Sequence, residues 1–182
     1  DSVIRYWNIV TDKFGELTRI NMLNVRASII EPEKNLYISG DNYGNMIFQS
    51  GRFQDQKKNK PHANNISSLV LAEKHNLFIS SSADNTVKFH NMKTGELMAT
   101  LLLVDSIDQF LVLPDNNYTG TKRAISMVNF RKDNVVYPFE QFDLQYNRPH
   151  EVYKALGVKD TALLTVYKRA WEKRMKRAGI KE

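Results

Sequence analysis

Histidines are the side chains here most able to hold a metal ion or move a proton, and the chain has His62, His75, His90 and His150. No two of them have the four-residue spacing of a helical metal site, and none stands beside a carboxylate in a known ligand arrangement. The sequence contains no cysteine, which excludes thiolate metal sites, disulfides and a caspase-type nucleophile. Glycine-rich phosphate loops and a Gly-x-Ser-x-Gly motif are also absent from it. We therefore predict no catalytic residue, no metal site and no cofactor.

Carboxylates offer the next possible chemistry. Glu140 and Asp143 stand three apart in an aromatic-rich segment, and a pair of carboxylates could perform acid–base catalysis. We favour a structural role, in which they pair with Arg148 or accept hydrogen bonds from backbone N–H groups. Asp41 and Asp84 stand in predicted turns, where aspartate accepts local backbone hydrogen bonds, and calcium binding is the alternative there.

The C-terminal residues mix aromatic and basic side chains. Tyr153, Tyr167 and Trp171 beside lysines and arginines could form a stacking surface for nucleic acid. Their spacing at three and four residues instead favours the apolar face of a helix, with the basic residues in solvent. We expect Trp171 to be buried against the β part or a partner. The candidate partner or packing surface comprises Tyr167, Lys168, Trp171 and Arg174.

The net charge of +6 is concentrated at one end of the chain. Residues 166–182 hold seven lysines and arginines and two glutamates, so 7 − 2 = +5 comes from this segment. Such a patch can attract nucleic acid or an anionic surface, although a run of charge is more often a solvated face. No apolar run approaches the ~20 residues that a membrane-spanning helix requires.

These side chains are set on a repeated unit. Residues 1–8, 43–50 and 84–91 are versions of one stretch, and residues 35–39 align with 76–80 without a gap, at a spacing of 76 − 35 = 41. Four short strands for each such unit, with turn residues between them, is the period of a β-propeller blade. The predicted strands are 1–9, 17–22, 25–31, 36–39, 46–49, one near 53, 66–72, 77–80, 86–91, 96–103, 109–113 and 118–119.

The stretch 84–97 resembles the end of a WD40 repeat: an aspartate turn, a strand that should close on Trp-Asp, a turn with glycine, and an outer strand. The resemblance implies a hydrogen-bonded tetrad that includes the turn aspartate and the strand tryptophan. On this chain the matching structural positions are Asp1 with Trp7, and Asp84 with His90.

The copies of this unit are degenerate. The middle one has Tyr43 and Gln49 at the two positions, so its tetrad should be missing. No copy shows the Gly-His pair of the family. We therefore expect the blades to be stabilised mainly by apolar packing.

The chain changes character after residue 119. We predict a partial propeller over 1–119, an irregular aromatic-rich linker over 120–148, and a two-helix extension over 149–182. Within the linker, residues 121–130 fit either a short helix or a strand. In the extension, Asn147 is the expected N-cap of a helix that ends at Gly157, and Asp160 caps a second helix that ends at Gly179.

The tail carries a second resemblance. Residues 137–143, 146–149 and 156–157 are similar to a segment of large bacterial proteins in which a WD40 propeller is joined to a caspase-like peptidase domain. The similarity covers residues 118–182. It implies that a peptidase domain, if present, would follow Glu182.

The expected fold is mainly β: an incomplete WD40-like β-propeller of about two and a half blades with a C-terminal α-helical extension. Because such an arc cannot close, we expect the chain to be a fragment of a longer protein whose exposed sheets are covered by protein partners, by self-association or by the missing blades.

Two functions compete. We favour a non-catalytic protein-interaction scaffold belonging to a larger protein with a separate effector domain, a caspase-like peptidase. The alternative is a nucleic-acid-binding module that uses the basic C-terminal helix. A hydrolytic function is disfavoured because the sequence shows no nucleophile or metal constellation.

Overall fold

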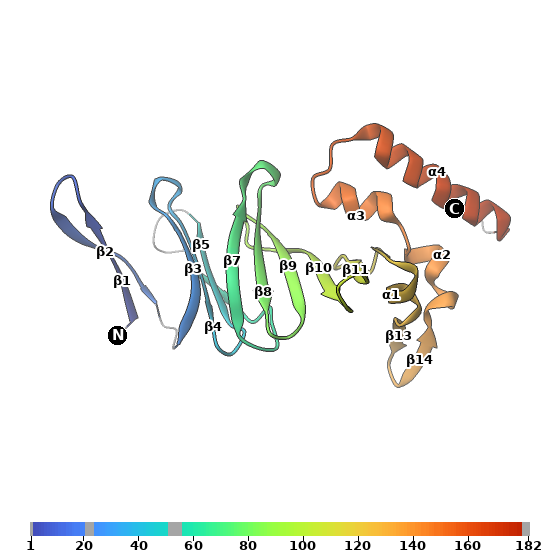
Figure 1. The fold of residues 1–182 in the computed structure, drawn as a ribbon, viewed down its shortest axis with the longest axis horizontal. Coiled ribbons are helices and arrows are strands. Elements are labelled where there is room, and N and C mark those ends of the chain that lie inside the picture. Colours follow the sequence, from blue (N-terminus) through green and yellow to red (C-terminus); the bar gives the residue numbers. More distant parts are fainter. Residues whose placement is uncertain (1, 21–23, 51–55, 180–182) are drawn as a thin grey trace. The chain divides into compact units, whose positions relative to one another are not determined.

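The computed structural model describes residues 2–20, 24–50 and 56–179 (Figure 1). It divides into two compact units. The first comprises Asp1–Val70 with Ser80–Asp84, and the second comprises Leu71–Ile79 with Asn85–Glu182. Strands dominate the chain up to residue 120 and helices dominate its end, so the mainly β class with a C-terminal helical extension is confirmed. No described helix is long and apolar enough to cross a membrane.

The first unit contains a hairpin and a four-stranded sheet. The hairpin is β1 (Ser2–Asn8) with β2 (Lys13–Ile20), and β2 begins four residues before the strand we predicted. The sheet follows chain order, as a blade does: β3 (Val25–Glu31), β4 (Leu36–Asp41), β5 (Met46–Ser50) and β6 (Gln56–Asn59). The fourth strand, expected near Phe53, falls outside the described residues, and β6 comes after it.

Apolar residues on the two central strands form the core of this sheet. Every residue of β4 is buried, and β5 is buried over Met46–Gln49. Strands buried on both faces read as continuous apolar runs instead of alternating ones. Gly40 is required in β4, because a Cβ there would lie 2.6 Å from a methyl carbon of Ile66.

The next sheet has six strands in chain order. They are β7 (Ile66–Ala72), β8 (Leu77–Ser82), β9 (Thr86–Asn91), β10 (Leu97–Leu103), β11 (Gln109–Val112) and β12 (Tyr118–Gly120). We expected 109–119 to begin a new blade. Instead β11 pairs with β10, with Leu101 opposite Leu111, because the loop at 104–108 is short enough to return the chain antiparallel to β10.

The repeat is visible in local backbone geometry. The 3-10 turns η1 (Pro32–Lys34) and η2 (Glu73–His75) both end on an asparagine in the left-handed conformation. These are Asn35, with φ of 48°, and Asn76, with φ of 56°. Asparagine tolerates this conformation better than most residues, which explains why the same residue returns at the same place in the unit.

Residues 120–148 are regular where we predicted an irregular linker. The elements are α1 (Lys122–Ser126), β13 (Asn129–Lys132), β14 (Val135–Pro138), η3 (Phe139–Gln141) and α2 (Asp143–Tyr146). Both readings of 121–130 are present in succession, because α1 is followed at once by β13. Elements of three to five residues are too short to show a hydrophobic period, so the sequence pattern could not reveal them.

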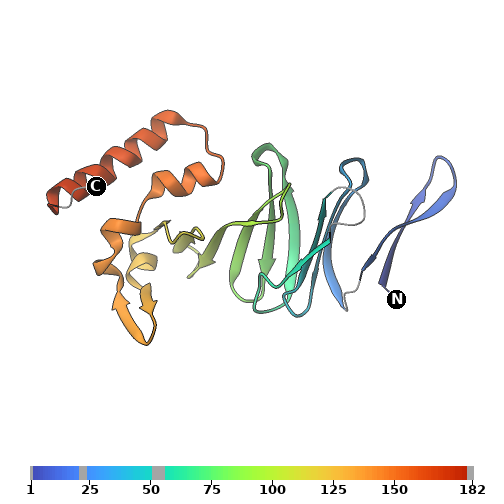
Figure 2. The same ribbon diagram turned by 180° about the vertical axis from the view of Figure 1, so that it is seen from behind.

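Two helices end the described chain: α3 (Pro149–Ala155) and α4 (Thr161–Arg177), which contact one another (Figure 2). The predicted cap of α4 is confirmed, since Asp160 Oδ1 accepts the Leu163 N–H at 3.0 Å. The predicted cap of α3 is wrong by one residue. Arg148 occupies the N-cap without a side-chain bond, because the Asn147 amide donates to Asp143 instead.

The strands β11 and β12 form the centre of the second unit. Phe110 and Tyr118 pack with Ala124 and Ile125 of α1 in one cluster. Leu111, the residue after Phe110 in β11, packs against another cluster, which contains Ala99, Leu113 and Val152 of α3. Since successive residues of a strand point to opposite faces, the helix α1 and the helix α3 cover opposite faces of this part of the sheet.

Candidate functional site

Three polar side chains form a buried network in the first unit. His62 Nε2 lies 2.8 Å from Ser80 Oγ, and His62 Nδ1 lies 3.0 Å from Asp84 Oδ2. The same carboxylate oxygen accepts the Ala63 N–H at 2.9 Å. His62 is 2% exposed and Ser80 is 0% exposed. The network therefore joins the segment before β7 to β8 and to the turn after it.

His62 thus lies between a serine and an aspartate, as the histidine of a hydrolytic triad does. In such a triad the histidine activates the serine and the aspartate orients the histidine. In this structure the Ser80 hydroxyl has no exposed surface that a substrate carbonyl could reach. The arrangement instead satisfies polar groups in the protein interior, where an unpaired one is costly.

The structure adds a residue to the predicted blade positions. Asp84 pairs with His62, which the sequence analysis did not connect with it, and His90 is buried and stacks on Phe78 with centroids 4.7 Å apart. The missed signal was the presence of a histidine ahead of a strand, serine and aspartate in one repeat unit. Pro61 precedes His62, so the expected Gly-His pair is absent there.

The other predicted pair cannot be traced, because Asp1 lies outside the described residues. Trp7 is 55% exposed, and its Nε1 donates to Asp12 Oδ1 at 3.0 Å. Its ring stacks on Phe14, with centroids 5.7 Å apart. The indole thus bonds across the turn of its own hairpin.

Trp171 is buried as expected, with 2% of its surface exposed. Its Nε1 donates to the Leu144 carbonyl at 2.8 Å, which ties α4 to α2. The Arg148 guanidinium lies 4.3 Å from the centre of the indole, close enough for a cation–π contact. The His150 ring lies 5.6 Å away. Trp171 is therefore the anchor of α4.

The Asp143 carboxylate interacts with three side chains. It accepts the Tyr118 hydroxyl at 2.9 Å and the Asn147 amide at 2.9 Å on one oxygen, while Arg174 lies 3.3 Å from the other. Arg174 also donates to the Asn147 carbonyl at 2.7 Å. We expected Asp143 to pair with Arg148 or to accept backbone N–H bonds, but the cation beside it is Arg174. Burial, followed by the nearby Asp143 carboxylate, raises the pKa of Tyr118 and keeps its hydroxyl a donor.

The remaining predicted residues lie along α4. Tyr167 packs on Tyr153 of α3 with ring centroids 5.4 Å apart. Burial, followed by the neighbouring phenol of Tyr167, raises the pKa of Tyr153. Lys168 is exposed, with its Nζ 3.8 Å from a Glu172 carboxylate oxygen. Glu140 is exposed too and takes no part in the Asp143 network as described.

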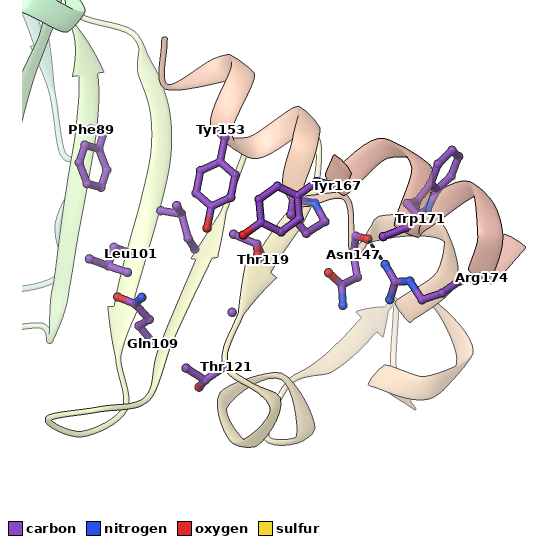
Figure 3. A pocket seen from close by; sticks show the side chains of 14 residues that line it. Phe89, Leu101, Gln109, Thr119, Thr121, Asn147, Tyr153, Tyr167, Trp171 and Arg174 are labelled. Atoms are coloured by element: carbon purple, nitrogen blue, oxygen red, sulfur yellow. Dashed lines mark hydrogen bonds between the residues drawn. The ribbon is translucent and has the colours of Figure 1, made fainter. Parts of the chain in front are cut away.

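A groove of about 540 Å³ opens beside these side chains in the second unit. Figure 3 shows it between strands and the two helices, with the Tyr153 and Tyr167 hydroxyls turned toward each other and Arg174 bonded to Asn147. The lining residues are Phe89, Leu101, Gln109, Leu111, Thr119, Gly120, Thr121, Asn147, Pro149, Tyr153, Tyr167, Ala170, Trp171 and Arg174. It is an apolar floor with hydroxyl, amide and guanidinium groups around it.

The lining of the groove offers few groups that could exchange protons. Its lining contains no histidine and no carboxylate, and its only cation is Arg174. Among the described residues there is no group of three or more histidines, aspartates or glutamates placed to hold a metal ion. What the lining offers a ligand is apolar contact and hydrogen bonds.

Comparisons with known proteins assign no family. No protein-family model matches the chain, and no curated protein matches it. The computationally designed Ika4 protein is a similar solved structure, with 17% identity, 67% of this chain and 89% of that chain covered, and a TM-score of 0.39. A chain of the mitotic checkpoint complex is another, with 15% identity, 72% and 44% covered, and a TM-score of 0.44. This chain thus spans less than half of that one, and similarities this weak transfer neither fold family nor function.

Proposed function

We propose that this chain is a non-catalytic protein-interaction scaffold. One observation carries the proposal: the molecule's triad-like side chains are sealed in its interior, while its open groove is lined for contact. Ser80 has no exposed surface, and the groove lining lacks an acid–base pair. Repeated sheet units of this kind offer broad surfaces for other proteins, which fits a binding role.

Site-specific photo-cross-linking tests the scaffold function. A benzophenone amino acid replaces Ala170, which is exposed and lines the groove, in cells that express the protein. Ala162, exposed on the same helix and outside the lining, is the matched control. We expect discrete protein adducts from position 170 and none from position 162. Adducts that are equal at both positions, or absent from both, would contradict a groove-based scaffold.

A hydrolase assay tests the absence of catalysis. We expect the protein to hydrolyse p-nitrophenyl acetate and casein no faster than the Ser80→Ala variant does. Loss of a measurable rate on that substitution would show that the buried triad opens to substrate, and would overturn the non-catalytic role.

We further propose that the scaffold belongs to a longer polypeptide with a caspase-like peptidase as its effector. The support is the resemblance of residues 137–149 and the nearby Leu156–Gly157 to a segment of such proteins. The coding sequence beyond Glu182 decides this point. A downstream domain with a histidine and a cysteine in peptidase order is expected, and a reading frame that ends without one would contradict it.

Nucleic-acid binding is the second candidate, and the exposed basic residues of α4 favour it. They are Lys168, Arg169, Lys173, Lys176 and Arg177. Phosphate contacts release counterions, so such binding should weaken steeply as salt rises. A gel shift with single-stranded and duplex DNA over a range of salt concentrations separates the candidates. The scaffold proposal predicts no discrete complex even at low salt.

A further inference from the structure

The groove in the second unit has a floor suited to one apolar side chain. Phe89, Leu101 and Leu111 line it from neighbouring strands, and each is half-buried, so part of its surface remains open. Leu101 stands directly opposite Leu111 in the pairing of β10 with β11, which places the two side chains on one face. Covering this apolar surface would be favourable at roughly 25 cal/mol for each Å².

The aromatic rings around the groove are already packed. Trp171 is 2% exposed and sits against the Arg148 guanidinium. Tyr153 and Tyr167 pack on each other. Stacking of a nucleobase requires an open ring face, and these contacts already occupy part of the surface of all three rings. The floor therefore suits an aliphatic side chain better than a base.

The helix that borders the groove is strongly basic. Lys173 and Arg177 lie three and seven residues after Ala170, which places them on the side of α4 that carries this groove residue. Both are exposed, and neither has an ion pair in the described structure. Arg174, by contrast, is held by Asp143. The border thus presents unneutralised positive charge beside an apolar floor, which is complementary to an acidic ligand.

We propose that this groove binds an acidic peptide segment of a partner protein. One aliphatic side chain lies on Leu101 and Leu111, and flanking carboxylates meet Lys173 and Arg177. The proposal rests on the scaffold function and names the chemistry of its partner. No covalent step is involved.

Fluorescence anisotropy tests the proposal with labelled peptides and the full chain. The probe is Glu-Asp-Glu-Leu-Glu-Asp-Glu, compared with the same peptide carrying glycine in place of leucine. We expect the leucine peptide to bind about tenfold more tightly, as expected for ~1.4 kcal/mol of apolar contact. Equal affinities, or no binding of either peptide, would overturn the proposal.

Two pairs of variants locate the site. Ala170→Trp fills the groove and should weaken binding about tenfold, whereas Ala162→Trp on the same helix should leave it unchanged. Lys173→Glu with Arg177→Glu should abolish binding. Lys74→Glu with Lys93→Glu alters two exposed lysines outside the groove by the same charge and should have a small effect. Equal losses within either pair would contradict the site.

Other occupants give different results. If a labelled oligo(dT) binds the wild type and the Ala170→Trp substitution abolishes that binding, the occupant of the groove is nucleic acid and the acidic-peptide inference is wrong. If light scattering shows a dimer of the wild type and a monomer of the Ala170→Trp variant, the occupant is a second copy of the chain and the acidic-peptide inference is wrong. If the peptides fail while position 170 still cross-links to a protein, the scaffold function stands and the acidic-peptide inference falls.

Discussion

At the scale of single residues, His62 decides how the turn after β8 is held. Its two ring nitrogens contact Ser80 and Asp84 in a buried setting. Both partners lie far from it in sequence, so the network exists only when β7 and β8 have formed. The serine, histidine and aspartate contact one another in the interior of the first unit.

His62→Ala should therefore lower the free energy of unfolding by about 2–4 kcal/mol, because it takes this partner away from Ser80 and Asp84 in the interior. Chemical denaturation monitored by circular dichroism measures this. His75→Ala is the control, since His75 is exposed in η2, and it should change stability by less than about 0.5 kcal/mol. Equal effects of the two substitutions would show that the network does not stabilise the fold.

Gly44 is a second residue whose identity is imposed by geometry. Its φ is +81°, and a Cβ there would lie 2.1 Å from the His62 carbonyl oxygen. Gly44→Ala should cost more than the ~1 kcal/mol of a left-handed alanine alone, because the backbone at His62 must also move.

Gly179→Ala is the matched control for this substitution. Gly179 has φ of +70° but nothing within 4 Å of the position a Cβ would take. The difference between the unfolding midpoints of the two variants isolates the steric contact with His62. If Gly179→Ala is as destabilising as Gly44→Ala, the contact contributes nothing.

At the scale of elements, Trp171 joins α4 to the rest of its unit. It is buried, bonds the Leu144 carbonyl and supports Arg148. Trp171→Ala should lower the free energy of unfolding by about 3–5 kcal/mol through loss of burial and a cavity. Val166→Ala, on the same helix at 64% exposure, should have little effect. An unchanged midpoint for Trp171→Ala in thermal denaturation would show that α4 is not anchored by its indole.

The contact of α3 with α4 should also depend on pH. Burial lowers the pKa of His150 below its ordinary value of 6.5. The nearby cations Arg148 and Lys168 also lower this pKa, whereas the carboxylates of Glu151 and Glu172 raise it. The unfolded chain then takes up a proton before the folded one does. Stability is full above pH ~6.5 and falls as the pH drops toward the folded pKa.

Unfolding midpoints of the wild type and of His150→Gln, measured across this range, test the pH dependence. The variant cannot titrate at this position, so its midpoint should fall less on acidification. Parallel curves for the two proteins would show that His150 does not contribute. Every other ionisable group is common to both proteins, so the difference between their curves isolates position 150.

At the scale of the whole molecule, sheets with open edges must be kept from pairing with one another. The strand β6 is an edge of its sheet, and Lys57 and Lys58 stand on it exposed. Lysines on an edge oppose pairing with the edge of another molecule, because bringing them together concentrates like charge. Lys57 and Lys58 thus have a structural use that requires no nucleic acid.

Lys57→Val with Lys58→Thr should promote self-association, since the edge loses its charge and gains residues that favour strands. Size-exclusion chromatography with light scattering should show larger species that increase with protein concentration. Lys93→Val, in an exposed turn, is the control and should remain as the wild type. A monomeric double variant would contradict the role of β6 as a protected edge.

Sequence alone could predict the features that depend on local periodicity. The spacing of apolar residues between Asp160 and Gly179 defined α4 and its buried face, and the recurrence of 35–39 at 76–80 defined matching strands and turns. The sequence could not predict that Asp84 pairs with His62. The two residues are 84 − 62 = 22 positions apart, and a sequence pattern contains no information on which residues a hairpin brings together.

The structure alone decided where these predicted elements meet. Residues 109–112 extend an existing sheet, because a short return brings them against β10. Within residues 120–148, the ring of Phe130 contacts those of Phe142 and Tyr146, which lie well beyond it in the sequence. Asp143 pairs with Arg174 because the helix α4 packs against α2 in the folded unit. Local pattern determines which elements form. Long-range packing determines which side chains share a site, because it depends on distances that no sequence spacing contains.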